Sequence, residues 1–65
     1  MRSLTSGQLQ VLKASQQKRG TSKGEMPGDL WRNFDQLEYR GLIEEVGHFY
    51  FITPAGRLAL HQQPQ

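Results

Sequence analysis

Two apolar stretches joined by Gly47-His48 constrain the fold of this chain most strongly. The first stretch ends at Val46 and the second begins at Phe49, so only two residues separate them. A two-residue loop with glycine first is typical of a type II′ turn in a β-hairpin. Because alternate strand residues point to opposite faces, this register predicts two partly apolar faces. They are Ile43, Glu45, Tyr50 and Ile52 on one face, and Glu44, Val46, Phe49 and Phe51 on the other.

An amphipathic helix over residues 29–40 is predicted directly before the hairpin. Asp29 can cap its N-terminus, and Leu30, Phe34 and Leu37 then form one inward stripe. Gly41 ends the helix, because glycine readily adopts the left-handed conformation that closes a helix. The outward face would carry Arg32, Gln36 and Tyr39, with Asp35 and Arg40 on its flanks and Trp31 half-buried at an edge.

A capping box near the start of the chain predicts a first helix. The Thr5 side chain can accept the backbone N–H of Gln8 while the Gln8 side chain accepts that of Thr5. This helix is expected to run to about Lys18 and to end at Gly20. Its core face would carry Leu4, Val11, Leu12 and Ser15.

The remaining segments complete the predicted order. Residues 20–28 contain three glycines and a proline, which predicts a loop with a short helical turn over residues 22–26. After the hairpin, Thr53 caps a closing helix whose first position is Pro54, where the missing N–H costs nothing. Its apolar edge is expected to consist of Ala55 and Leu58 with Ala59 or Leu60, and residues 62–65 are expected to fray.

The predicted fold class is therefore α+β, a small winged helix that occupies residues 1–65 as one domain. It has three helices or helical turns, a two-stranded antiparallel hairpin as the wing, and a short C-terminal helix. The core of such a short chain supplies only about 3–5 kcal/mol. With no cysteine, and with His48 and His61 lacking companion ligands, no metal site, disulfide or cofactor is expected. The chain has no apolar run that could serve as a signal peptide or membrane span, so a cytoplasmic protein without a membrane partner is expected.

Charge is distributed unevenly along the chain, although the net charge is only +2. Residues 1–23 carry five cations and no acid, whereas residues 24–65 carry three arginines against six carboxylates. This asymmetry favours an anionic partner that approaches from the N-terminal half. For any single lysine, a solvated surface position explains the residue equally well.

Two motifs resemble the winged helix-turn-helix regulators of the MarR type. The residues Leu37-Glu38-Tyr39-Arg40-Gly41-Leu42-Ile43 resemble the Gly-Leu-Ile exit from their recognition helix. The residues Tyr50-Phe51-Ile52-Thr53-Pro54-Ala55-Gly56 resemble the Tyr-x-Leu-Thr-x-x-Gly exit from their wing. The resemblance implies duplex DNA binding in transcriptional regulation, with residues 29–40 in the major groove.

Roles carried over by position follow from this resemblance. The base-facing residues would be Arg32, Gln36 and Tyr39, because arginine reads guanine and glutamine reads adenine. The phosphate contacts would be Arg40, Lys18, Arg19, Ser22 and Lys23, with His48 at the wing tip. Three carboxylates on the same helix, namely Asp29, Asp35 and Glu38, depart from the pattern because they repel phosphate.

An enzyme is not expected, because no catalytic constellation is present. The segment Gly20-Thr21-Ser22-Lys23-Gly24 resembles a phosphate loop only superficially, since it lacks the spacing and the preceding strand. Neither histidine lies in a nucleophile-elbow context, and no small-molecule substrate is indicated.

The second hypothesis is a winged-helix adaptor or inhibitor that binds another protein. Its anchors would be the apolar residues Val46, Phe49, Phe51 and Trp31. The outer hairpin face could be covered in three ways: by the C-terminal helix, by a second protomer or by a protein partner. Packing under the C-terminal helix is the preferred interpretation.

Overall fold

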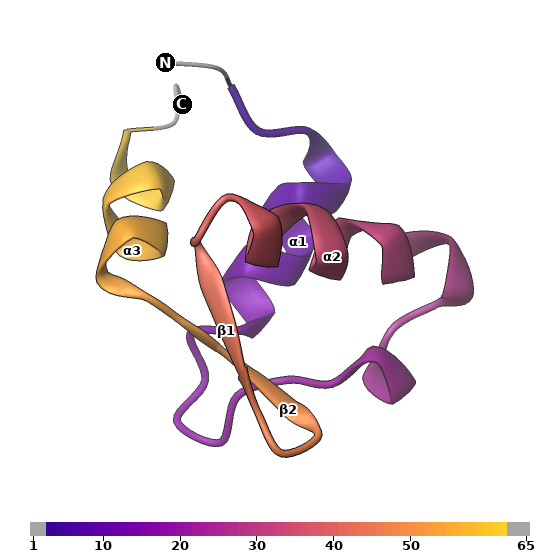
Figure 1. The fold of residues 1–65 in the computed structure, drawn as a ribbon. Coiled ribbons are helices and arrows are strands. Elements are labelled where there is room, and N and C mark those ends of the chain that lie inside the picture. The colour runs from indigo at the N-terminus through magenta and orange to yellow at the C-terminus, as the bar shows by residue number, and fades with distance from the viewer. Residues whose placement is uncertain (1–2, 63–65) are drawn as a thin grey trace.

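The computed structural model describes residues 3–62 as an α+β arrangement consistent with a small winged helix (Figure 1). It confirms the predicted fold class, with three helices and one two-stranded antiparallel hairpin among the described residues. In chain order the elements are α1 (Ser6–Ala14), the 3₁₀ turns η1 (Lys23–Glu25) and η2 (Gly28–Leu30), α2 (Trp31–Tyr39), β1 (Ile43–Val46), β2 (Phe49–Ile52) and α3 (Pro54–His61). None of these helices is long and apolar enough to cross a membrane.

The first helix begins as predicted and ends early. The Thr5 hydroxyl accepts the Gln8 backbone N–H at 3.1 Å, and the Gln8 side chain accepts the Thr5 N–H at 3.0 Å. Leu4, Val11, Leu12 and Ser15 are buried, as predicted. The expected continuation to Lys18 is wrong, because α1 ends at Ala14. The carbonyl of Ser15, which a longer helix would use internally, instead accepts the N–H of Ile52 at 3.0 Å.

Gly20 does not cap α1 but turns the chain toward the hairpin. Its φ is +75°, and a Cβ there would lie 2.7 Å from the carbonyl oxygen of Tyr50. The next residue, Thr21, forms an isolated antiparallel bridge with Tyr50 through two backbone hydrogen bonds of 2.6 and 3.0 Å. Backbone groups of Thr21 and Ser15 therefore form hydrogen bonds with β2 along the edge that does not face β1. The sequence pattern did not predict these contacts.

The start of α2 differs from the expectation, whereas its end agrees with it. Asp29 lies inside η2 and caps nothing. The N-cap position is Leu30, whose backbone is already helical, so no extended residue is present to carry a side-chain cap. At the other end Gly41 has φ +77°, and its N–H donates to Glu38. The N–H of Leu42 donates to Leu37, which completes a Schellman motif.

The hairpin has the predicted register, with Val46 opposite Phe49 and Ile43 opposite Ile52. Gly47 has φ +67°, and no described non-glycine residue has a positive φ, so only the first turn residue is left-handed. That is the pattern of a type II′ turn. Ile43 and Tyr50 are buried, so the face they share with Ile52 points to the core.

The last helix closes the core against β2 and the segment after α2. The Thr53 hydroxyl accepts the Gly56 N–H at 3.0 Å, and Pro54 is the first helical residue, as predicted. Gly56 and Ala59 are buried, whereas Leu58 is 57% exposed and Ala55 is also exposed, so the expected apolar edge is wrong for both. Gly56 packs closely on Leu42 and Ile52, and this contact fixes the rotation of the helix. Gln62 caps α3 rather than fraying, and the rest of the predicted frayed tail lies outside the described residues.

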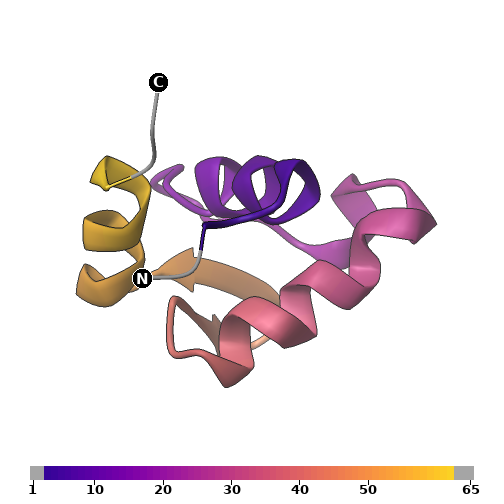
Figure 2. The ribbon, with the colours of Figure 1, turned by 90° about the horizontal axis from the view of Figure 1, so that it is seen from above.

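The core lies where the three helices and the inner hairpin face meet. Seen from above, α3 lies at one end of the molecule and the two 3₁₀ turns at the other, with the strands between them (Figure 2). Phe34 and Tyr50 stack in a tilted arrangement with ring centroids 4.9 Å apart. Val11, Leu12, Phe34 and Leu37 are completely buried. This core leaves the outward side of α2 exposed to solvent.

Candidate nucleic-acid interface

The outward side of α2 carries the predicted base-facing residues, and all three are exposed. Tyr39 is 93% exposed and so projects into solvent. Gln36 is held in place, because its Oε1 accepts a hydrogen bond of 3.0 Å from Nε2 of Gln8 on α1. Its own Nε2 group keeps its donors for a ligand. Arg32, Gln36 and Arg40 are spaced four residues apart and therefore form one stripe along the helix.

Both arginines of this stripe are unpaired. Within residues 3–62 the guanidinium groups of Arg32 and Arg40 make neither an ion pair nor a hydrogen bond to another side chain or carbonyl. The stripe itself contains no carboxylate. Its free cationic donors are those that bind phosphate oxygens and base edges.

The opposite flank of α2, toward the hairpin, is acidic. Nζ of Lys23 lies 3.2 Å from Oδ1 of Asp35, and this hydrogen bond raises the pKa of Lys23. Burial raises the pKa of Tyr50; the charge of Lys23 lowers it, and the charges of Glu45, Glu38 and Asp35 raise it further. Lys23, predicted as a free phosphate contact, is therefore already occupied by a carboxylate. A phosphate on this flank would meet three acids.

Arg19 is the second predicted phosphate contact that the structure pairs internally. Its guanidinium lies 2.7 Å from Oε2 of Glu25, and this bond raises the pKa of Arg19 and lowers that of Glu25. Lys18 is exposed without such a partner, Ser22 precedes η1 without capping it, and His48 is exposed at the hairpin tip. The basic N-terminal segment is thus only partly available to an anion.

The outer hairpin face is not covered by α3, so the preferred interpretation is wrong. Val46 is 58% and Phe49 is 39% exposed. Phe51 is partly buried, because its ring lies against Gly20. The face stays open because α3 packs on Leu42 and Ile52, on the inner side of the sheet.

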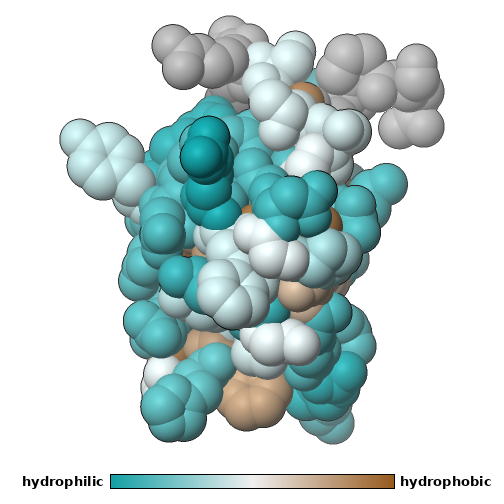
Figure 3. Space-filling view, turned by 90° about the vertical axis from the view of Figure 1, so that its right-hand side faces the viewer, coloured by the Kyte–Doolittle hydropathy of each residue, from teal (hydrophilic) through white to brown (hydrophobic). Residues whose placement is uncertain are grey.

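Trp31 does not belong to this hairpin face. It is 46% exposed at the start of α2, and its indole N–H donates to the carbonyl of Met26 at 3.2 Å. The surface on this side of the molecule is mostly hydrophilic, with only small apolar areas between polar side chains (Figure 3). The structure therefore separates one predicted interface residue from the other three.

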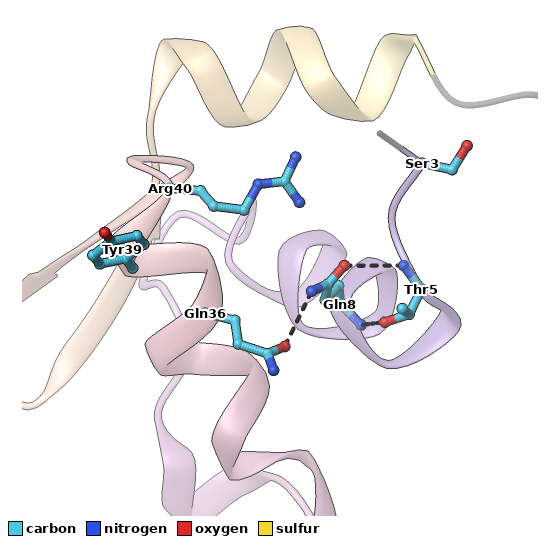
Figure 4. A pocket seen from close by; sticks show the side chains of 6 residues that line it. All are labelled: Ser3, Thr5, Gln8, Gln36, Tyr39 and Arg40. Carbon is cyan, nitrogen blue, oxygen red and sulfur yellow. Dashed lines mark hydrogen bonds between the residues drawn. The ribbon is translucent and has the colours of Figure 1, made fainter. Parts of the chain in front are cut away.

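A pocket of about 590 Å³ lies between the start of α1 and the end of α2 (Figure 4). Its lining residues come from both elements and are Ser3, Thr5, Gln8, Gln36, Tyr39 and Arg40. Sequence reasoning missed the contribution of the first three. The capping box holds Thr5 and Gln8 together, but only tertiary packing brings Gln8 to Gln36 on α2.

No group of three or more histidines and carboxylates that could hold a metal ion occurs among residues 3–62. The lining residues of the pocket carry a guanidinium, two amides and three hydroxyls. No known protein family, curated protein or solved structure matches this chain.

Proposed function

We propose that this protein binds duplex DNA through α2 and acts in the cytoplasm in transcriptional regulation. The observation that carries the proposal is the stripe of Arg32, Gln36 and Arg40, an exposed row of donors with two unpaired cations and no acid. The resemblance of the chain to MarR-like regulators supports the same role for this helix. An exposed helix with such a row fits the major groove.

The charge on the two flanks of α2 orients the duplex. Phosphates would pass on the side of the stripe, toward α1, and away from Asp35, Glu38 and Glu45. In this arrangement the hairpin contributes little to binding, and His48 is at most a minor contact. Gln36 suits an adenine contact, because Gln8 fixes its amide plane while its Nε2 stays free.

Fluorescence anisotropy with a labelled random duplex at several salt concentrations tests the proposal. The slope of log K against log salt should fall by about one unit in Arg32→Gln and again in Arg40→Gln. Arg57→Gln is the matched control, because it removes the same charge from α3, outside the stripe. If folded protein shows no binding at low salt, or if all three variants lose affinity equally, α2 is not the reading element.

A second candidate function rests on the open hairpin face. The exposure of Val46 and Phe49 gives this face an apolar patch that a protein partner or a second copy could bury. Sedimentation velocity of the wild type and of Phe49→Ser tests self-association. A dimer that dissociates in Phe49→Ser, with unchanged melting, supports this function, whereas a wild-type monomer at high concentration rules out the homodimer. Phe51→Ser is a poor probe, because Phe51 packs on Gly20.

A further inference from the structure

The lining of the pocket between α1 and α2 carries positive charge and no negative charge. Among its six lining residues one is cationic and none is a carboxylate. Two acids adjoin lining residues along the chain, Asp35 beside Gln36 and Glu38 beside Tyr39, and each lies about 100° around the helix from that neighbour. The lining itself is therefore cationic, although the acidic flank of α2 borders it.

Hydrogen bonds within the wall of the pocket use one lone pair of each of three oxygens and leave several donors available. The Oε1 atoms of Gln8 and Gln36 each accept a hydrogen bond, and Thr5 Oγ1 accepts the N–H of Gln8. Gln36 Nε2 and the Thr5 hydroxyl proton have no acceptor in the described residues, and Arg40 adds its guanidinium. A negatively charged ligand that accepts several hydrogen bonds matches the donors of this wall.

The two glutamine amides are held in place before any ligand arrives, whereas the exposed Arg40 side chain makes no such bond within residues 3–62. The Gln8 side chain is fixed at both ends by bonds of 3.0 Å, to Thr5 and to Gln36. Arg40 follows α2 at its C-cap, where its backbone N–H donates to Gln36. Its side chain extends toward the space beside Gln8, whereas the Tyr39 ring points away from it (Figure 4). Such preorganisation lowers the entropic cost of binding.

We propose that this pocket binds a phosphate group, with the planar fork of Arg40 as a bidentate ligand and with Thr5 and Gln36 as further donors. The pocket is open to solvent, because most of its lining residues are exposed, so the organic group that carries the phosphate can extend out of it. The phosphate belongs either to the DNA backbone or to a free phosphate ester. In the first case this inference rests on the proposed function.

A titration with inorganic phosphate, observed by ¹H–¹⁵N NMR at constant ionic strength, tests the site without DNA. The backbone amides of Thr5, Gln8, Gln36 and Arg40 should shift and saturate. Arg40→Gln should abolish these shifts, and Arg57→Gln should retain them. Shifts that do not saturate, or that are the same in Arg40→Gln, would reflect general ionic effects and would overturn the site. The thermal melt of Arg40→Gln verifies that it is folded.

Two further arms identify the source of the phosphate. If duplex DNA displaces inorganic phosphate, and Arg40→Gln weakens DNA binding about tenfold, the pocket holds a backbone phosphate. If a mononucleotide displaces phosphate but DNA does not, the pocket holds a free phosphate ester and has no part in DNA binding. Phosphate binding without any DNA binding overturns the proposed function alone. DNA binding without phosphate binding overturns the pocket alone.

Discussion

Replacing Gly56 by alanine should destabilise the protein, although the same change usually stabilises a helix. Gly56 lies in the first turn of α3, and a Cβ there would collide with the carbonyl oxygen of Leu42 and lie 2.8 Å from Cγ1 of Ile52. The Leu42 carbonyl cannot move away freely, because it accepts the N–H of Thr53 at 3.1 Å. The N–H of Leu42 is held by Leu37 at 3.0 Å.

The size of the effect follows from two opposed contributions. Alanine gains up to about 1 kcal/mol over glycine in a helix. Overpacking against fixed backbone costs about 3 kcal/mol, at the upper end of the usual range. The expected net loss is therefore about 2 kcal/mol, roughly half of the stability that a core of this size supplies. For a domain of this length the melting temperature should fall by about 8–16 °C.

Thermal and urea unfolding followed by circular dichroism measures this loss, and Gly7→Ala is the matched control. Gly7 also lies in the first turn of a helix, but its Cβ would meet Nδ2 of Asn33, the end of a flexible side chain, at 2.7 Å. The Asn33 side chain can turn aside, so Gly7→Ala should be neutral or slightly stabilising. If Gly56→Ala melts at or above the temperature of Gly7→Ala, the close packing of α3 on Leu42 is refuted.

Two further substitutions test single contacts. Thr53→Ala should lower the free energy of unfolding by about 1–2 kcal/mol, because the Thr53 hydroxyl caps Gly56 and also donates to the Gly41 carbonyl at 2.7 Å. Thr53→Ser keeps both bonds and should match the wild type in urea denaturation. Tyr50→Phe should protect the protein from alkali. Burial raises the pKa of Tyr50, so its contribution to stability is complete below about pH 10 and is lost as the pH rises through the raised pKa. A melting difference between Tyr50→Phe and wild type that stays constant through this range would contradict the raised pKa of Tyr50.

Features set by adjacent residues could be predicted from the sequence. The hairpin register follows from Gly47 and the alternation around it, and the end of α2 follows from Gly41. The Thr5 capping box and the Thr53–Pro54 start of α3 are equally local. In each case, residues within one turn of each other form the decisive hydrogen bonds, so tertiary context does not change the outcome.

Features set by distant contacts could not be predicted in this way. α1 ends at Ala14 because Ser15 bonds to Ile52, which lies 37 positions further along the chain. Leu58 points outward because the close approach of Gly56 fixes the rotation of α3. Helical periodicity alone allows several rotations of such a short helix, and the smallest residue decides among them.

In the candidate site, too, the features set by local sequence could be predicted and those set by distant contacts could not. Exposure of Arg32, Gln36 and Tyr39 follows from the helical period and is confirmed. The pairing of Arg19 with Glu25 and of Lys23 with Asp35 depends on how the loop before α2 folds back on it. A count of cations along the sequence therefore overstates the charge available to a phosphate.

These two ion pairs also bear on which part of the molecule would carry the proposed DNA binding. Moving Lys23 to a phosphate would leave Asp35 as an unpaired carboxylate beside the same phosphate, so the attraction gained is offset by repulsion. The same holds for Arg19 and Glu25. Arg32 and Arg40 have no such partner in the described part of the chain, so each can bind a phosphate or a base without releasing an acid. If the protein binds DNA, the salt dependence should therefore come mainly from α2, and the hairpin face is left for a protein contact.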